Sequence, residues 1–273
     1  MEISGKLIGK VLQTAFQAGK AIMDIYKLPF EVELKSDNSP LTIADKTAHK
    51  IISEGLSNTG LPILSEEGAQ ISYDIRRNWK SYWLVDPLDG TKEFIKKNGD
   101  FTVNIALISY HQPILGVVYA PVPGFMYWGS ESGSFRLNVD HTANIDFENF
   151  HSIEALAEQL PCISRPEGYL VLGSRSHMNT ETESFINDLK IAHPDLRFIS
   201  RGSSLKFCTL AEGGADIYPR FGPTMEWDTG AGHAVAKFAG CSVEQVENGL
   251  PVEYNKPSLL NPYFIARSKK KMR

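Results

Sequence analysis

Residues 83–91 read WLVDPLDGT and decide the fold that we expect for this chain. The apolar start of the stretch has the residue types of a buried strand. The strand should stop at Asp86, because Pro87 cannot continue a sheet ladder. A short helix is expected over residues 92–97. Two carboxylates, those of Asp86 and Asp89, therefore stand at the carboxyl end of a strand, beside the start of a helix.

This arrangement indicates metal-assisted phosphoryl chemistry. The two carboxylates repel each other unless a cation lies between them, and hard oxygen ligands suit Mg²⁺, which also keeps waters and phosphate oxygens. The free N–H groups and the positive partial charge of a helix start suit a phosphate. The competing interpretation is an ordinary strand-to-helix turn, in which Asp and Gly are common anyway. The stretch alone leaves both interpretations open.

Length and composition describe an ordinary globular protein. The 273 residues are enough for one large domain or two smaller ones that share a cleft, and 42% hydrophobic with 22% charged residues is typical of a soluble chain. A net charge of −4 argues against general nucleic-acid binding. Three widely spaced cysteines make neither a disulfide framework nor a zinc site, which favours a reducing cytoplasm.

The first residues and the last residues of the chain bear on where the protein is located. Lysines interrupt every apolar stretch near the N-terminus, so we expect neither a signal peptide nor a transmembrane helix. The basic residues 269–273 have two interpretations. They are a frayed, solvated end, or they are weakly attracted to an anionic membrane surface such as the cytoplasmic side of the inner membrane. We expect a cytoplasmic protein.

Three further acidic residues stand at element boundaries. Asp45 follows Thr42 at capping-box spacing, so it either caps a helix or orients a water. Glu66 follows a short apolar strand and repeats the pattern of the opening stretch, which favours one shared metal cluster. Asp228 precedes a helix expected over residues 231–238, where it suits an N-cap or a metal ligand. For Asp45, taken alone, capping is the stronger interpretation.

The order of the expected elements changes near the middle of the chain. Residues 1–150 combine two helices with an antiparallel meander, whereas residues 151–273 alternate strands and helices in the manner of βαβ units. We therefore expect an N-terminal α+β half and a C-terminal α/β half. The final strands are expected near residues 249–252 and 263–266.

Two strands of the second half are expected to run into Gly- and Ser-rich turns that suit a phosphate. The turn after residues 169–172 holds Ser176 and His177. The other turn starts at Gly202 and leads into a helix that carries Lys206. Taken alone, the basic residues of these turns are more often ordinary surface groups.

Together these motifs resemble the inositol monophosphatase-like family of magnesium-dependent, lithium-sensitive phosphatases. Residues 83–91 are similar to its first signature, WDTGAG at residues 227–232 to its second, and the glutamates 66–67 to a third acidic element. The chain resembles the family's bacterial CysQ branch, the 3′(2′),5′-bisphosphate nucleotidases, at residues 37–42, 91–95, 202–208 and 218–224. The similarity covers nearly the whole chain except about residues 138–168.

The resemblance implies a fold and an activity. The fold is a layered αβαβα sandwich of the inositol monophosphatase and fructose-1,6-bisphosphatase type, with the metal site between the two halves. The activity is hydrolysis of the 3′-phosphate of adenosine 3′,5′-bisphosphate to AMP and phosphate in sulfur assimilation, with the sulfated nucleotide PAPS as a related substrate. The alternatives are an inositol monophosphatase or other sugar phosphatase, and a catalytically silent nucleotide sensor. We expect a small phosphorylated nucleotide as ligand, and a monomer or homodimer.

By position, the resemblance also assigns roles to single residues. The ligands of two or three Mg²⁺ ions would be Glu66, Asp86, the Leu88 carbonyl, Asp89 and Asp228. Asp45 and Thr91 would form the pair that activates the attacking water. The substrate contacts would be Glu66, Leu88, Asp89, Gly90, Thr91, Ser176, His177, Gly202, Lys206 and Asp228.

Overall fold

The computed structural model describes most of the chain. The described residues are 3–29, 32–34, 40–139, 145–164, 167–174 and 179–268. Ser176 and His177, two of the expected substrate contacts, lie outside the described residues, and so does the basic tail 269–273.

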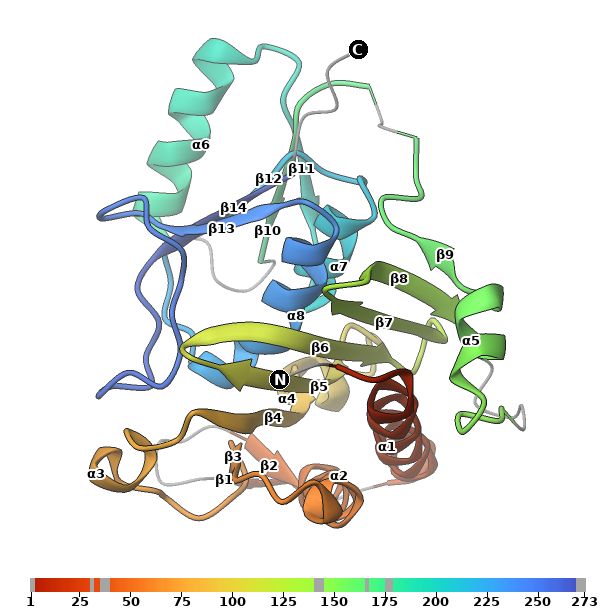
Figure 1. The fold of residues 1–273 in the computed structure, drawn as a ribbon. Coiled ribbons are helices and arrows are strands. Elements are labelled where there is room, and N and C mark those ends of the chain that lie inside the picture. Colours follow the sequence, from red (N-terminus) through yellow and green to blue (C-terminus); the bar gives the residue numbers. More distant parts are fainter. Residues whose placement is uncertain are drawn as a thin grey trace.

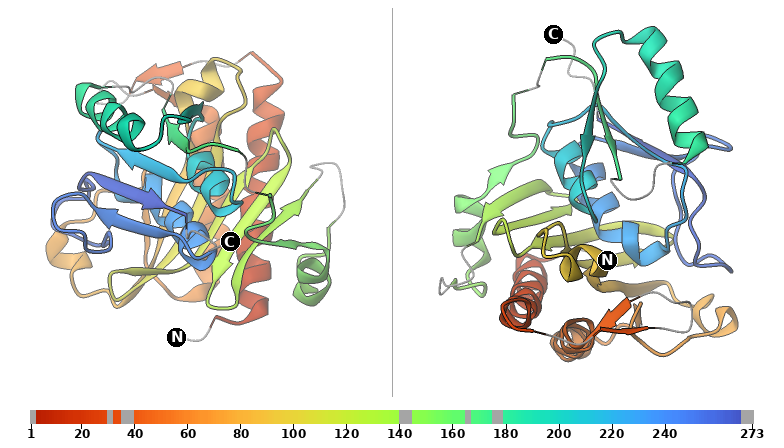
Figure 2. Two further views of the ribbon diagram at one scale, coloured as in Figure 1. Left: turned by 90° about the horizontal axis from the view of Figure 1, so that it is seen from above. Right: turned by 180° about the vertical axis from the view of Figure 1, so that it is seen from behind.

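Helical layers alternate with two sheets along the molecule (Figure 1). One outer layer holds α1 (Gly5–Tyr26) and α2 (Ile43–Leu56), and the opposite outer layer holds α6 (Thr180–Ala192). Between the two sheets lie α7 (Leu205–Ala211) and α8 (Glu226–Phe238). The view from behind in Figure 2 again places α2 and α6 at opposite ends of the stack. The αβαβα order confirms the expected fold class.

The first sheet has seven strands in sequence order, from β3 to β9. β3 and β4 pair in parallel, and the remaining neighbours pair antiparallel, which confirms the expected meander. β9 lies beyond residue 150, so this sheet extends past the expected division of the chain, which itself stays a prediction. The strands are β3 (Ile63–Ser65), β4 (Ser81–Asp89), β5 (Thr102–Ser109), β6 (Gln112–Ala120), β7 (Phe125–Ser130), β8 (Gly133–Asn138) and β9 (Glu158–Gln159).

The second sheet has five strands in the order β11-β10-β12-β14-β13. β10 pairs in parallel with β11 and β12, as expected of βαβ units, and β14 pairs antiparallel with β12 and β13. The prediction of a strand at residues 249–252 was wrong. Gly249 turns the chain there with a φ of +71°, and Pro251 makes an isolated bridge to Glu244. The strands are β10 (Leu170–Gly173), β11 (Arg197–Ser200), β12 (Ile217–Arg220), β13 (Ser242–Gln245) and β14 (Phe264–Arg267).

Short elements complete the fold. A two-stranded antiparallel sheet precedes α2, and short helices follow β3, β4 and β8. These elements are β1 (Val32–Leu34), β2 (Pro40–Thr42), the 3₁₀ helix η1 (Ser57–Thr59), α3 (Tyr73–Arg76), α4 (Thr91–Ile95) and α5 (Phe150–Leu156).

The strand β4 does not end at Asp86 as expected, but continues to Asp89. Asp86 pairs with Asn104 and Asp89 with Thr102, so β4 uses one residue more than β5 between these two pairs. This is a β-bulge, and Pro87 lies in it, where a missing N–H does not interrupt the ladder. After the bulge the chain continues through Gly90 into α4.

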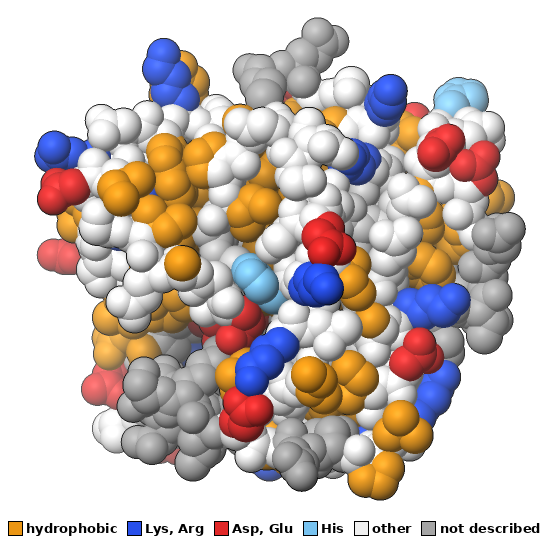
Figure 3. All heavy atoms as spheres, turned by 90° about the horizontal axis from the view of Figure 1, so that it is seen from below, with side chains coloured by type: hydrophobic (Ala, Val, Ile, Leu, Met, Phe, Trp, Pro, Cys, Tyr) orange, Lys and Arg blue, Asp and Glu red, His pale blue; other side chains and the backbone are white. Residues whose placement is uncertain are grey.

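Hydrophobic clusters fill the spaces between the layers. Trp83 and Val85 of β4 face the cluster formed with α1 and α2, whereas Tyr82 and Leu84 face the cluster around α7 and α8. This alternation is that of a strand buried on both faces. A third cluster packs α6 on the second sheet. The face opposite α6 shows acidic and basic side chains interspersed with apolar ones (Figure 3).

Two glycines allow α8 to lie directly on the first sheet. A Cβ atom at Gly116 would lie 2.4 Å from the Ala231 carbonyl oxygen, and one at Gly129 would lie 2.7 Å from the Ala234 carbonyl oxygen. Any side chain at these positions would push the helix off the sheet. This close packing brings the first turn of α8 to the acidic end of β4.

Candidate active site

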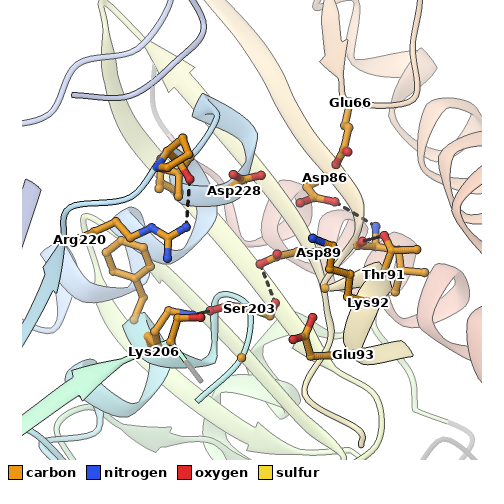
Figure 4. Close-up of a pocket in the computed structure, with 18 of the residues that line it drawn as sticks. Glu66, Asp86, Asp89, Thr91, Lys92, Glu93, Ser203, Lys206, Arg220 and Asp228 are labelled. Carbon is orange, nitrogen blue, oxygen red and sulfur yellow. Dashed lines mark hydrogen bonds between the residues drawn. The ribbon is translucent and has the colours of Figure 1, made fainter. Parts of the chain in front are cut away.

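Three of the predicted carboxylates converge where the end of β4 meets the start of α8 (Figure 4). Glu66 follows β3, Asp86 lies on β4, and Asp228 lies in the first turn of α8. One oxygen of each lies within 4.8 Å of the others. Three anionic oxygens at this separation, all of them hard ligands, suit a divalent cation such as Mg²⁺.

The electrostatics of this cluster also fit a cation. Burial raises the pKa of Asp86 well above its ordinary value, and the neighbouring carboxylates of Glu66, Asp89 and Asp228 raise it further. Desolvation raises the pKa of Asp228 to about 8, with Asp89 and Glu66 adding to the effect. Crowded carboxylates that resist ionisation gain most from a bound positive charge, so the residues present fit a metal site.

Asp89, the fourth predicted carboxylate ligand, lies in the same cavity but is turned toward the second half of the chain. Its Oδ2 accepts hydrogen bonds from Ser203 Oγ at 2.6 Å, from the Ser204 N–H at 2.7 Å and from Asn104 Nδ2 at 3.2 Å. The structure therefore gathers three of the four predicted carboxylates into one cluster and ties the fourth, beside it, to the turn before α7.

The side chain of Asp45 makes two separate sets of hydrogen bonds. Its Oδ2 accepts from the N–H and from the hydroxyl of Thr42, both at 2.7 Å, and so caps α2. Its Oδ1 accepts from Thr91 Oγ1 at 3.2 Å. Burial raises the pKa of Asp45, while the bonds from Thr42 act in the opposite direction. The same carboxylate therefore both caps α2 and pairs with Thr91.

The segment between the bulge and α4 places backbone groups beside the acidic cluster. The Leu88 N–H donates to Asp86 Oδ1 at 3.1 Å, and the Leu88 carbonyl oxygen lies 3.3 Å from Thr91 Oγ1. Gly90 has a φ of +92°, and a Cβ there would lie 3.0 Å from the Asp100 carbonyl oxygen. A glycine is therefore needed for the turn that delivers Thr91 to the site.

Asp228 is not the N-cap that the sequence suggested. The helix α8 begins earlier than expected, at Glu226, whose N–H has no partner within the helix and donates to the Leu259 carbonyl oxygen at 2.9 Å. Asp228 is the third helical residue, and its Oδ2 accepts the Met225 N–H at 2.8 Å. The Asp228 carboxylate thus accepts the N–H of the N-cap residue Met225 and also belongs to the cluster with Glu66 and Asp86.

A cavity of about 260 Å³ joins these groups to the second half of the chain. Of the predicted site residues, those that line it are Glu66, Asp86, Leu88, Asp89, Gly90, Thr91, Gly202, Lys206 and Asp228. Sequence reasoning missed several polar lining residues, namely Lys92, Glu93, Ser174, Ser203, Arg220 and Thr224. All of them carried a signal, because each lies in a stretch that the sequence analysis singled out. Ser174 lies in the turn after residues 169–172 and Ser203 follows Gly202, while Lys92, Glu93, Arg220 and Thr224 lie in the family-like stretches 91–95 and 218–224.

Two cationic side chains lie across the cavity from Asp86 and Thr91 (Figure 4). Lys206 is 6% exposed, so its interpretation as a solvated helix residue was wrong. Its Nζ donates to the Ser203 carbonyl oxygen at 2.7 Å, and burial lowers its pKa to about 8. Arg220, at the end of β12, donates from Nη2 to the Pro223 carbonyl oxygen at 2.9 Å. The cavity is therefore acidic on one side and basic on the other.

Comparison with known proteins agrees with this geometry. The family model described as the inositol monophosphatase family matches residues 7–272. The chain belongs to the inositol monophosphatase family. The resemblance seen in the signature motifs is thereby confirmed.

The similar proteins include two CysQ proteins and one suhB protein. The 3′(2′),5′-bisphosphate nucleotidase CysQ of Escherichia coli (strain K12) is 45% identical over 263 residues, which are 94% of this chain and 98% of that protein. The crystal structure of CysQ from Bacteroides thetaiotaomicron, a bacterial member of the inositol monophosphatase family, has a TM-score of 0.88 and 45% identity, covering 96% of this chain and 97% of that one. The extragenic suppressor protein suhB from Bartonella henselae has a TM-score of 0.70 and 25% identity, covering 96% and 93%.

Among the described residues, α1 and the other helices lack the combination of length and apolar character that crossing a membrane requires.

Proposed function

We propose that this member of the inositol monophosphatase family is a magnesium-dependent 3′(2′),5′-bisphosphate nucleotidase. Its reaction is hydrolysis of the 3′-phosphate of adenosine 3′,5′-bisphosphate to AMP and phosphate, with PAPS as a related substrate, in sulfur assimilation. The observation that carries the proposal is the two-sided cavity. A carboxylate cluster beside the Asp45–Thr91 pair faces Lys206 and Arg220, which gives a doubly phosphorylated ligand a place for each phosphate. The 45% identity to CysQ over 94% of the chain supports the same substrate.

The metal ligands proposed are the clustered carboxylates of Glu66, Asp86 and Asp228, with Asp89 and the Leu88 carbonyl beside them. When bound there, two or three Mg²⁺ ions would polarise the phosphate oxygens and lower the pKa of a water. The side chains supply negative charge in a partly buried cavity, where its effect on a cation is larger than in bulk water. Magnesium dependence is general in the family, and the number of ions is part of our proposal.

The proton of the attacking water is assigned to Thr91 and Asp45. The Thr91 hydroxyl donates to Asp45 Oδ1, so the lone pairs of Thr91 Oγ1 are free to accept a proton from a water. Thr91 then passes its own proton to Asp45, whose raised pKa makes the carboxylate a stronger base. The two bonds from Thr42 hold Oδ2 in place during the transfer.

The part of the nucleotide that is not cut is assigned to the basic side of the cavity. Lys206 and Arg220 project from α7 and β12, and Gly202 lines the same cavity. Ser176 and His177 stay predicted contacts outside the described residues. Inositol 1-phosphate has a single phosphate and leaves these cations without a phosphate partner, so the cavity favours the bisphosphate.

The test is a panel assay of phosphate release on the full chain. The substrates are adenosine 3′,5′-bisphosphate, inositol 1-phosphate and fructose 1,6-bisphosphate, each with Mg²⁺ and each with EDTA. We expect Mg²⁺-dependent release that is fastest from the nucleotide. Faster release from either sugar phosphate would favour a sugar phosphatase, and nucleotide binding without release would favour a silent sensor.

A further inference from the structure

A buried hydrogen-bond network lies beneath the acidic side of the cavity, centred on Asn104 of β5. Asn104 is 1% exposed, and it lies outside the lining of the cavity. Its Nδ2 donates to Asp89 Oδ2 at 3.2 Å and to Ser204 Oγ at 3.0 Å, and its Oδ1 accepts from Thr102 Oγ1 at 3.0 Å. Both ends of the amide are engaged, so its orientation is fixed.

The network continues into the second half of the chain through two adjacent serines. Ser204 Oγ donates to the Asp228 carbonyl oxygen at 3.1 Å, which ties the turn to the start of α8. Ser203 Oγ lies 2.6 Å from Thr102 Oγ1 and donates to Asp89 Oδ2. Ser203 has a φ of +51°, a conformation that costs energy for a residue with a Cβ atom. Strain of this kind persists where the surrounding contacts hold it.

These contacts fix the orientation of the Asp89 carboxylate. Its Oδ2 accepts three hydrogen bonds, from Asn104, Ser203 and Ser204, so the direction of the carboxylate is set from behind. The other oxygen, Oδ1, is then the one available to an ion. Partners of this kind, which touch a metal ligand rather than the metal, commonly control the affinity of a site.

The bulge in β4 explains why Asn104 reaches Asp89 at all. In the strand ladder Asn104 stands opposite Asp86, and Asp89 stands opposite Thr102. Thr102 and Asn104 are two positions apart on β5, so they share one face of the sheet. The extra residue in β4 brings Asp89 over that face, where both polar side chains lie below it.

We propose that Asn104 is a positioning residue that sets magnesium affinity by holding Asp89 and the turn at residues 203–204 as one unit. The inference rests on the proposed function, because it takes Asp89 to be a metal ligand. Asn104 acts through Asp89, since it lies beneath the cavity lining. A network that served the fold alone would affect stability and leave metal binding unchanged.

The experiment measures Mg²⁺ binding to the full chain by isothermal titration calorimetry without substrate. In Asn104→Ala, Asp89 loses one donor and Ser204 loses its link to β5, so we expect Mg²⁺ affinity to fall about 10-fold or more. The Mg²⁺ concentration for half-maximal phosphate release should rise by the same factor. The KM for adenosine 3′,5′-bisphosphate at saturating Mg²⁺ should change much less. Thr102→Val is a milder variant of similar shape that removes the donor to Asn104 Oδ1, and we expect a smaller shift in the same direction.

Tyr127→Phe is the matched control. Tyr127 is buried, and its hydroxyl donates to Glu212 Oε1 at 2.8 Å, in a second network that lies outside the cavity lining. Its loss should lower the melting temperature and leave Mg²⁺ affinity unchanged. If Asn104→Ala and Thr102→Val lower the melting temperature in the same way and bind Mg²⁺ like the wild type, the inference is overturned. A wild-type chain that binds no Mg²⁺ would overturn the proposed function as well, so the two failures are distinguishable.

Discussion

Thr91 Oγ1 lies 3.2 Å from Asp45 Oδ1, although the two residues are 46 positions apart in the sequence. Asp45 sits in the first turn of α2, where its other oxygen caps the helix, and Thr91 is the first residue of α4. The first turns of α2 and α4 therefore meet at the Asp45 carboxylate. A cap and a proton acceptor make different demands on that carboxylate, which allows the two roles to be separated by mutation.

Asp45→Asn tests the proposed role in catalysis. The amide keeps one oxygen, which can still accept from Thr42, and asparagine caps helices about as well as aspartate. Its NH₂ group would face Thr91 Oγ1 and cannot take up a proton. We expect turnover to fall by roughly 100-fold or more, the scale of losing a general base, with Mg²⁺ affinity retained. The measurement is kcat with adenosine 3′,5′-bisphosphate, together with Mg²⁺ binding.

Thr42→Ala is the control for the cap. It removes the hydroxyl that donates to Asp45 Oδ2 but leaves the Thr91 contact in place. It should cost about 1 kcal/mol of stability, as the loss of a cap does, and little turnover. A folded Asp45→Asn variant with wild-type turnover would leave capping as the sole role of Asp45.

Two acidic residues of the site were predictable because Glu66 and Asp86 each follow a clear apolar run, although β4 continues past Asp86 to Asp89. Asp228 alone suited an N-cap equally well, and the family resemblance assigned it to the same metal site. The αβαβα order was predictable through the family resemblance that the same motifs carry.

The rest depended on pairings that a linear pattern does not contain. Asn104 lies in an apolar strand, and Ser204, one of its partners, is 100 positions away, so the network under Asp89 had no local signature. The continuation of β4 past Pro87 requires the register with β5. The burial of Lys206 requires the sheets that enclose α7.

The second prediction concerns pH and the stability of the metal-free protein. The pKa values of Asp86 and Asp228 are raised in the folded chain, that of Asp228 to about 8, so the folded state binds more protons than the unfolded state above pH 4 or so. Their contribution to stability is therefore present at low pH and is lost as pH rises toward about 8. We expect the melting temperature of wild type, relative to Asp86→Asn, to fall between about pH 5 and pH 8 in EDTA.

Magnesium should reverse this difference. A bound cation favours the ionised carboxylates, so saturating Mg²⁺ should raise the melting temperature of wild type most near pH 8 and that of Asp86→Asn much less. Asp86→Asn should also lose nearly all phosphate release. A difference in melting temperature that is flat with pH would contradict the proposed crowding of buried charge.

The third prediction concerns substrate choice. Lys206 and Arg220 line the basic side of the cavity, and a charge-assisted contact to phosphate is worth roughly 1.5–3 kcal/mol. Lys206→Met should therefore lower kcat/KM for adenosine 3′,5′-bisphosphate about 10-fold or more, and leave slow hydrolysis of a simple monophosphate nearly unchanged. Arg220→Met should act in the same direction.

The measurement is the ratio of the two specificity constants in wild type and variants. Because Lys206 Nζ also donates to the Ser203 carbonyl oxygen, a loss of loop order would lower both constants together. A ratio that stays constant in both variants would remove these cations from the substrate site and reopen the choice between nucleotide and sugar phosphate.

The last prediction concerns Glu226, which anchors the start of α8 two residues before Asp228. Glu226 is fully buried, and it accepts the Asn255 N–H at 2.6 Å, the Lys256 N–H at 3.0 Å and Lys256 Nζ at 2.6 Å. Glu226→Gln weakens each of these charge-assisted bonds and should lower the free energy of unfolding by about 1–3 kcal/mol. The matched control is Glu244→Gln, which breaks an exposed pair with Arg267 and should cost at most about 1 kcal/mol. Urea denaturation in EDTA measures both, and equal losses in the two variants would show that Glu226 does not anchor the helix.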